Sequence, residues 1–413
     1  MLNPKTNVRE LAYVVNIDAI EPIQGSDNCE CAVVGGWHVM VRKNEFKAGD
    51  PAIYFEIDSY LDPSNPAFAF MERKKYKVKT QRYTFGGKGN FISQGLLMSA
   101  ANFEKQGWWK NELNHIIDSN GNVHKADDES RFLTKQLGVT YYIAEDNTRK
   151  ANSVDKYKKM AQRNGKLFSH QPFRWLMKRA WGRKLLFVFF GRKRDKKSGW
   201  PAWVVKTDEE RVQNMPWILN DKEPWIATEK IDGTSTTFTM KRGKWPHKDE
   251  FYICSRNVVF DKPDKACFYD TNVYTEMAEK YDIYNKMKDL LYNHFTDCEW
   301  ITIQGETYGP GIQKRDYHAP EHAFMAFNFI TSKDGRWGTE KMVDLLQGHM
   351  NIPCVPVLDT NFTLPDTVEE LLAYATAESV CDHDLREGIV FRSKDGSKSF
   401  KAVSNEFLLK YHQ

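Results

Sequence analysis

The strongest constraint on the fold lies near the front of the chain, where short runs of β-branched and aromatic residues follow one another over residues 10–100. Three of them read YVVNIDAI, CECAVVGGWHVMVRK and PAIYFEIDSYL, and glycines separate them. Short strands at such spacing are typical of a small barrel or sandwich. Residues 131–145 read as a closing connector. We therefore predict a β-barrel domain with its connector over residues 1–149.

The sequence changes character after residue 200, where helical and strand-like segments alternate. Apolar residues from Val273 to Leu291 recur at helical spacing, and DTVEELLAYA opens with a capping box formed by Thr367 and Glu370. The runs WITIQGE, AFMAFNFI, EGIVFRS and KSFKAVS read as strands. The chain is thus predicted to have an α+β fold, with a mixed α/β domain built on antiparallel sheets over residues 201–413.

A basic segment separates these two regions. The formal net charge is only +4, yet residues 151–200 contain 15 lysines and arginines against Asp155 and Asp195, an excess of +13. Tryptophan, phenylalanine, glycine and proline are interspersed with these charges. The composition indicates a basic linker or insertion over residues 150–200.

Membrane and export classes are disfavoured. The longest apolar run, LLFVFF at 185–190, is far shorter than the ~20 residues that span a membrane, and the N-terminus has no signal-peptide pattern. The seven cysteines are scattered without a CxxC pair, which favours reduced thiols and argues against a zinc cluster. We therefore expect an intracellular, cytoplasmic protein without membrane contact.

The most informative short stretch is EKIDGTSTTF, which begins at Glu229. Its lysine, Lys230, lies between two acids and close to a glycine, and it leads into a β-rich run. An exposed strand lysine is one interpretation, and a lysine held as a nucleophile is the other. Five further stretches follow in order, each with a charged or aromatic side chain in or beside a strand: CSRN, QGETYG, FMAFNFI, REGIVFR and SFKAVS.

This ordered set resembles the covalent nucleotidyltransferase superfamily, which contains ATP-dependent ligases and capping enzymes. TEKIDGTS is similar to the RNA-ligase form of the nucleophile motif, and KTDEERVQN at 206–214 resembles the segment that leads into it. The front of the chain resembles the OB domain of those RNA ligases that carry this domain first. DNA ligases and capping enzymes place an OB domain after the last lysine motif, whereas only 12 residues follow Lys401 here.

The resemblance implies an ATP-dependent RNA ligase that joins an RNA 3′-OH to a 5′-phosphate. Lys230 would first take AMP from ATP, the AMP would then move to the RNA 5′ end, and the 3′-OH would displace it. A DNA ligase or a capping-type nucleotidyltransferase is the alternative within the superfamily, and a non-catalytic RNA-binding protein is the alternative outside it. We expect RNA, ATP and Mg²⁺ or Mn²⁺ as partners and cofactors, and a monomeric protein.

Adenylation of a lysine needs a neutral amine near pH 7, whereas a free lysine has a pKa near 10.4. Lowering that pKa by ~3 units requires about 4 kcal/mol of differential stabilisation. Burial and nearby positive charge supply such a shift. The available cations are Arg256, Lys401 and a bound divalent metal, and Lys230 is the predicted nucleophile.

The resemblance also assigns the charged residues. Lys401 is expected on the α-phosphate. Asp232, Glu306 and Glu387 match the acids that hold the metal, often through waters, because hard cations prefer oxygen ligands. Asp232 has a structural alternative, in which its carboxylate bonds to its own backbone in a turn. The alternative for Glu387 is a cross-strand ion pair. Glu306 would bind the ribose as well as the metal, or instead of it. The last motif usually has two lysines, and Lys398 is the candidate for the missing one.

Nucleotide recognition is expected from residues that match the family's base and sugar contacts. Phe327 would stack on adenine, Glu229 would accept from its amino group, and Arg256 would lie near the AMP sugar and phosphate. Ser235 stands where some relatives have Asn at a ribose contact. Core packing for Phe327 and a solvated position for Arg256 are the alternatives. The predicted nucleotide-binding set is completed by Lys230, Glu306 and Lys401.

The basic segment also contains aromatic residues, among them Trp175 and Trp181. Its lysines and arginines would neutralise phosphates while the rings stack on bases, which predicts an arm that contacts RNA. The alternative is a solvated insertion whose aromatic residues pack on the main body.

Overall fold

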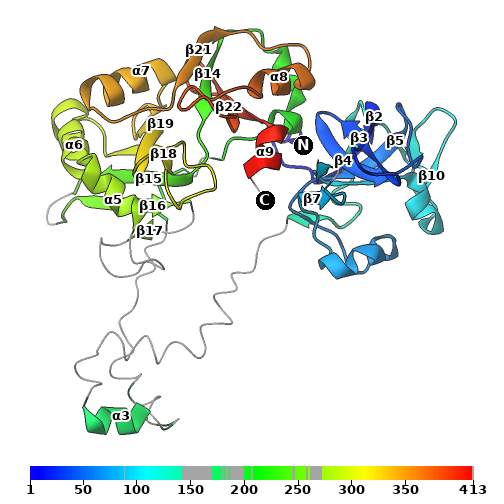
Figure 1. Ribbon diagram of the computed structural model, residues 1–413, viewed down its shortest axis with the longest axis horizontal. Helices are drawn as coiled ribbons and strands as arrows, with labels where there is room; N and C mark the ends of the chain where they lie inside the picture. The colour runs from blue at the N-terminus through cyan, green and yellow to red at the C-terminus, as the bar shows by residue number, and fades with distance from the viewer. Residues whose placement is uncertain are drawn as a thin grey trace. The chain divides into compact units, whose positions relative to one another are not determined.

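The computed structural model describes residues 1–87, 89–141, 170–177, 179, 181, 186, 200–205, 208–243, 247–256, 259–260 and 272–411. The chain divides into two compact units, one made of Met1–Tyr141 with Ala202–Gln413 and the other of Tyr142–Pro201. Most of the basic segment lies outside the described residues. The part that is described includes helix α3 (Gln171–Met177; Figure 1).

The front of the chain is strand-rich and antiparallel, as the sequence predicts. One sheet has the order β1-β5-β9, a second has the order β2-β3-β4, and β7 pairs with β8. The main strands are β1 (Ala12–Asn16), β2 (Ala19–Pro22), β3 (Cys29–Val34), β4 (Trp37–Arg42), β5 (Pro51–Phe55), β7 (Gln81–Thr84), β8 (Asn90–Ser93) and β9 (Leu96–Met98). The shorter elements are β6 (Ser59–Tyr60), η1 (Pro66–Lys74), η2 (Ala100–Gln106), β10 (Trp109–Lys110), β11 (Ile116–Ile117), β12 (Val123–His124), η3 (Glu129–Arg131) and β13 (Thr140–Tyr141).

Alternation along β4 shows how this domain forms its core. Trp37, Val39 and Val41 are buried on one face, whereas His38 and Met40 are only partly buried on the other. This period of two is the signature of a strand with one face in the core. On the other face, Met40 packs against a second apolar cluster formed by Ile23, Cys31 and Val33.

The C-terminal part contains two antiparallel sheets, one with the order β21-β14-β22-β23 and one with the order β17-β16-β15-β18-β19-β20. The four-stranded sheet consists of β14 (Trp225–Lys230), β21 (Val357–Phe362), β22 (Gly388–Ser393) and β23 (Ser399–Val403). The six-stranded sheet consists of β15 (Thr234–Lys241), β16 (Glu250–Ser255), β17 (Val259–Phe260), β18 (Trp300–Tyr308), β19 (Ala323–Thr331) and β20 (Gly335–Arg336). The α+β prediction is confirmed.

Helices cover these sheets (Figure 1). They are η4 (Val212–Asn214), η5 (Pro216–Asn220), α5 (Val273–Lys280), α6 (Ile283–Asp289), η6 (Leu290–His294), α7 (Thr339–Val343), η7 (Asp344–His349), α8 (Val368–Ala375) and α9 (Asn405–Tyr411). One core joins α5, α6 and α7 to the six-stranded sheet, and another joins α8 to the four-stranded sheet.

Two helix predictions had different outcomes. The capping box is present, because Thr367 Oγ1 accepts from the N–H of Glu370 at 3.2 Å and α8 begins at the next residue after Thr367. The helical run from Val273 to Leu291 is instead broken into α5, α6 and the π-helical turn η6. Asp282 separates α5 from α6 with a φ of 49°, in the left-handed region that interrupts a right-handed helix.

Contacts join the N-terminal domain to the C-terminal part. The N–H of Leu2 donates to the carbonyl of Asn214 at 2.8 Å, and the guanidinium of Arg211 lies 5.5 Å from the ring centroid of Trp37. Among the described residues, every helix is too short or too polar to cross a bilayer. The cysteines that the structure describes are free thiols.

The fold sets a strict steric limit at Gly305 in β18, where the pairing with β19 shifts register. A Cβ there would lie 2.3 Å from the carbonyl oxygen of Met325 and 2.4 Å from the ring of Phe324. We predict that Gly305→Ala lowers the free energy of unfolding by about 1–3 kcal/mol, because the backbone of β19 must shift to admit the methyl group. Chemical denaturation measures the change.

Gly348→Ala is the matched control, since a Cβ there meets only the Asp344 carboxylate at 3.5 Å, an ordinary contact. This control should keep wild-type stability within about 1 kcal/mol. Equal stabilities for the two variants would contradict the steric argument.

Candidate active site

A cavity of about 420 Å³ is lined by residues of both C-terminal sheets and of the segment 208–211. Its lining includes eight of the nine predicted site residues: Glu229, Lys230, Ser235, Arg256, Glu306, Phe327, Glu387 and Lys401. The ninth, Asp232, is buried and does not line the cavity, but its charge acts on Lys230. The sequence motifs, which are up to 172 residues apart, therefore meet in one place.

Lys230 is the last residue of β14, and every residue before it in that strand is buried. Its backbone pairs with Gly388 in β22, which brings Glu387 beside it. Nζ of Lys230 donates to Oε2 of Glu387 at 2.7 Å. Just beyond, Gly233 allows the chain to pass close to β18, since a Cβ would lie 2.3 Å from the carbonyl oxygen of Thr307. Strand pairing and one glycine thus fix the position of the lysine.

This environment raises the pKa of Lys230. Burial on its own would lower the pKa, but the nearby carboxylates of Glu387, Glu306 and Asp232 outweigh it. In the nucleotide-free chain the amine is therefore a paired ammonium. A positive charge added near these acids would lower the pKa of Lys230 again.

The cations expected near the lysine are paired with an acid that the sequence analysis did not single out. Asp208 accepts from Arg256 through a short hydrogen bond and from Nζ of Lys401 at 3.2 Å. The N–H of Lys401 also donates to the carbonyl of Glu210 at 2.8 Å, so this segment lies along β23. Burial tends to raise the pKa of Asp208, but Lys401 and Arg256 lower it overall. The only sequence signal was the position of Asp208 within KTDEERVQN.

Glu306 lies in β18, opposite Ser235 in β15. Burial raises its pKa to about 8, and the charges of Glu387 and Asp232 add to the rise while Lys230 opposes it. The main cause of the shift is the burial of the carboxyl, which disfavours its charged form. Three carboxylates around one amine form an all-oxygen set, which suits a hard divalent cation such as Mg²⁺ or Mn²⁺.

Side chains suited to a base and a sugar surround this charged centre. Glu229 is buried, and its carboxylate accepts from the hydroxyl of Ser379 and from the N–H of Val380 at 2.9 Å. Phe327 is partly buried and lines the cavity, with the Arg392 guanidinium 5.9 Å from its ring centroid. Its packing against a small apolar cluster holds the ring in place.

Lys398 does not take the place of a second lysine in the cavity. It is mostly exposed, does not line the cavity, and pairs with Asp221 at 2.6 Å. The cavity instead gains Arg392, a buried arginine in β22 whose pKa burial lowers to about 10. Arg392 and Arg336 both pair with Glu209. Sequence reasoning missed these groups because their role depends on tertiary pairing.

Comparisons with known proteins agree with this geometry. A family model described as RNA ligase matches residues 223–412, and a model described as an OB-fold domain matches residues 11–99. Curated protein sequences gave no match.

Solved structures of an RNA ligase from Naegleria gruberi resemble the whole chain. The ligase with PPi is 25% identical, and the match covers 98% of this chain and 99% of that chain with a TM-score of 0.59. A mutant without ligand is 25% identical, with 98% of each chain covered and a TM-score of 0.60. Another mutant, with ATP and Mn, is 24% identical, with 98% and 100% covered and a TM-score of 0.60.

An OB-fold domain, followed by an antiparallel α+β domain with a lysine in a highly charged cavity, defines a ligase of the covalent nucleotidyltransferase type. Within this chain, residues 223–412 form an RNA ligase domain, and an OB-fold domain over residues 11–99 lies in front of it.

We predict that Glu306→Gln changes how stability depends on pH. The folded-state pKa of about 8 lies above the ordinary value of 4.5, so the folded wild type holds an extra proton between these pH values. Its stability therefore falls as pH rises through this range. Relative to the wild type, the glutamine variant should gain roughly 1–3 kcal/mol between pH 6 and pH 9.

The measurement is chemical denaturation of nucleotide-free protein in chelator at both pH values. Glu104→Gln is the matched control. It removes an exposed carboxylate that is distant in sequence from Glu306, and it should show no such gain. A stability difference for Glu306→Gln that stays the same at pH 6 and pH 9 would rule out the shifted carboxyl.

Proposed function

We propose that this protein is an ATP-dependent RNA ligase, which joins an RNA 3′-OH to a 5′-phosphate through a lysine–AMP at Lys230 and an adenylated RNA 5′ end. The position of Lys230 carries the proposal, because it ends a buried strand inside a cavity with three nearby carboxylates and several cations. The RNA ligase domain over residues 223–412 favours this function over a DNA ligase or a capping-type enzyme. The full set of acids and lysines favours catalysis over RNA binding alone.

The reaction has three transfers. Nζ of Lys230 attacks the α-phosphorus of ATP, so that a P–N bond forms and the P–O bond to pyrophosphate breaks. The amine must first lose a proton, and the carboxylate of Glu387, 2.7 Å away, is positioned to accept it. An RNA 5′-phosphate oxygen then displaces the lysine, and the RNA 3′-OH finally displaces AMP.

We assign Asp232, Glu306 and Glu387 to a Mg²⁺ or Mn²⁺ ion, since their oxygens suit a hard cation. Such an ion would offset the carboxylates that raise the pKa of Lys230 and would favour the neutral amine. The similar ligase mutant solved with ATP and Mn supports both cofactors. Lys401 and Arg256 would exchange Asp208 for the phosphates of ATP.

Four further side chains of the same cavity would recognise the nucleoside of ATP. Phe327 would stack on adenine, because its aromatic side chain lines the cavity. Glu229 would accept from the adenine amino group, and Ser235 would contact the ribose. Arg256 would lie near the AMP sugar and phosphate once Asp208 releases it.

We also propose the functional organisation of the chain. Residues 1–149 form an OB-like domain with its connector, 150–200 a basic linker or insertion, and 201–413 the adenylation domain. The protein would act as a monomer in the cytoplasm, which is consistent with the free thiols of its described cysteines.

Incubation with α-labelled ATP and a divalent metal, followed by a denaturing gel, tests the nucleophile. Label should remain on the wild-type protein, because a P–N bond survives denaturation, and Lys230→Ala should lose at least 99% of it. Lys398→Ala is the matched control and should label normally, since this exposed lysine pairs with Asp221 outside the cavity. Robust labelling of the Lys230 variant would refute the assignment, and equal labelling by GTP would support a capping enzyme.

The basic segment is proposed to be an RNA-contacting arm. In its described part, Trp175 and Trp181 each expose about half of their surface, at 50% and 53%. The Arg179 guanidinium lies 4.0 Å from the Trp175 ring centroid. Exposed rings beside cations are the combination that binds single-stranded nucleic acid.

Replacing residues 156–197 with a short Gly/Ser linker should leave lysine adenylation intact but weaken RNA binding at low salt. Each lost phosphate contact lowers the slope of log affinity against log salt by roughly 0.7–0.9, so the slope should fall by several units. The control, Trp175→Ala with Trp181→Ala, should weaken binding without changing the slope, because it removes no charge. If the linker variant has the same slope as the wild type, the RNA-contacting arm is rejected and the alternative, a solvated insertion, stands.

A further inference from the structure

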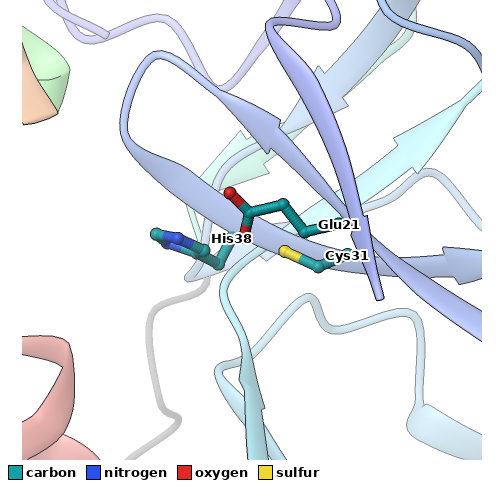
Figure 2. Close-up of side chains that lie close together, drawn as sticks. All are labelled: Glu21, Cys31 and His38. Atoms are coloured by element: carbon teal, nitrogen blue, oxygen red, sulfur yellow. The ribbon is translucent and has the colours of Figure 1, made fainter. Parts of the chain in front are cut away.

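A second cluster of ligand-type side chains lies in the N-terminal domain, on the sheet β2-β3-β4 (Figure 2). Glu21 in β2 pairs directly with Cys31 in β3, and Val33 in β3 pairs with His38 in β4. Since Cys31 and Val33 are two residues apart, these register positions place Glu21, Cys31 and His38 on one face of the sheet. One ligand atom of each lies within 4.8 Å of the others.

We propose that Glu21, Cys31 and His38 bind one Zn²⁺-class divalent cation. A carboxylate oxygen, a thiolate sulfur and an imidazole nitrogen form a mixed donor set that suits zinc, whereas Mg²⁺ and Mn²⁺ prefer oxygen alone. Bond lengths of about 2.0–2.3 Å require donors roughly 3.5 Å apart in a tetrahedron. Because Glu21 is exposed, its side chain can rotate to close the remaining gap.

Asn405 provides an independent observation that supports the site. Its Nδ2 lies 3.1 Å from Nδ1 of His38, while its Oδ1 is buried without a partner among the described residues. A metal on Nε2 of His38 leaves the proton on Nδ1, which then donates. Rotation of the amide by 180° exchanges Oδ1 and Nδ2, which are assigned from hydrogen bonding alone, and gives the orphaned oxygen its donor.

The proposed site differs from the catalytic one in place and in chemistry. Its ligands come from the OB-fold domain, whereas the acids around Lys230 come from the ligase domain. Cys31 would bind as the thiolate, so metal uptake releases one proton to solvent. Three protein ligands leave a fourth position for water. Through Asn405, the first residue of α9, the metal would hold His38 against the C-terminal helix.

A Co²⁺ titration of tag-free, full-length protein after chelator treatment tests this inference. The wild type should bind one equivalent with thiolate-to-cobalt charge-transfer absorption, and Zn²⁺ should bleach that absorption by displacement. Cys31→Ser should lose it. Cys29→Ser is the matched control, because this thiol belongs to the same strand and lies outside the cluster.

Two further variants test the site independently if Cys31→Ser misfolds. Glu21→Gln changes only an exposed side chain, so it should fold normally and bind Co²⁺ at least about tenfold more weakly. Asn405→Ala should also weaken binding by about tenfold, because it removes the partner of His38. Lysine adenylation with Mg²⁺ should be unaffected by Glu21→Gln.

Three results would overturn the proposal. They are a wild type that takes up no Co²⁺, a charge-transfer band that persists in Cys31→Ser, and an affinity for Co²⁺ that Glu21→Gln leaves unchanged.

Discussion

The ion pair between Lys230 and Glu387 is the interaction on which the active site depends. The pairing of β14 with β22 sets it, because Lys230 lies opposite Gly388 and the residue before Gly388 is the glutamate. A shift of one residue in this register would turn the lysine to the opposite face of the sheet. The buried strand before Lys230 opposes such a slip, since Trp225 would lose its place in the core against Phe400. The fold thus determines the chemistry through strand register.

In the nucleotide-free chain, the charges of the site are matched internally. Lys230 is shared among carboxylates, while Arg256 and Lys401 share Asp208. When substrate binds, these side chains therefore exchange one ionic partner for another, and few charges are left unpaired. The phosphates of ATP would replace Asp208, and a divalent cation would take over the acids from the ammonium. The second exchange moves the lysine toward the neutral form that attacks phosphorus, because the cation offsets the acids that hold its proton.

Sequence reasoning worked where the signal is local or carried by short motifs. The capping box at Thr367 fixed the start of α8, and the motif residues gather around one cavity. It failed where tertiary contacts decide. Asp282 breaks a continuous helical pattern because its left-handed backbone redirects the chain. Asp208 has no motif of its own, and Cys31 and His38 have no recognisable ligand spacing because strand pairing brings them together. Their roles can be read only from the folded chain.

The C-terminal strand and helix connect the two proposed metal centres physically. Lys401 lies in β23, and Ser404, just after that strand, donates its N–H to the carbonyl of Glu387 at 2.8 Å. The next residue, Asn405, begins α9 and meets His38 in the N-terminal domain. The five residues 401–405 therefore include the active-site cation Lys401, a hydrogen bond to the backbone of Glu387, and the contact to the OB-fold domain. One short stretch of backbone thus contacts both the OB-fold domain and the strand end that carries Glu387.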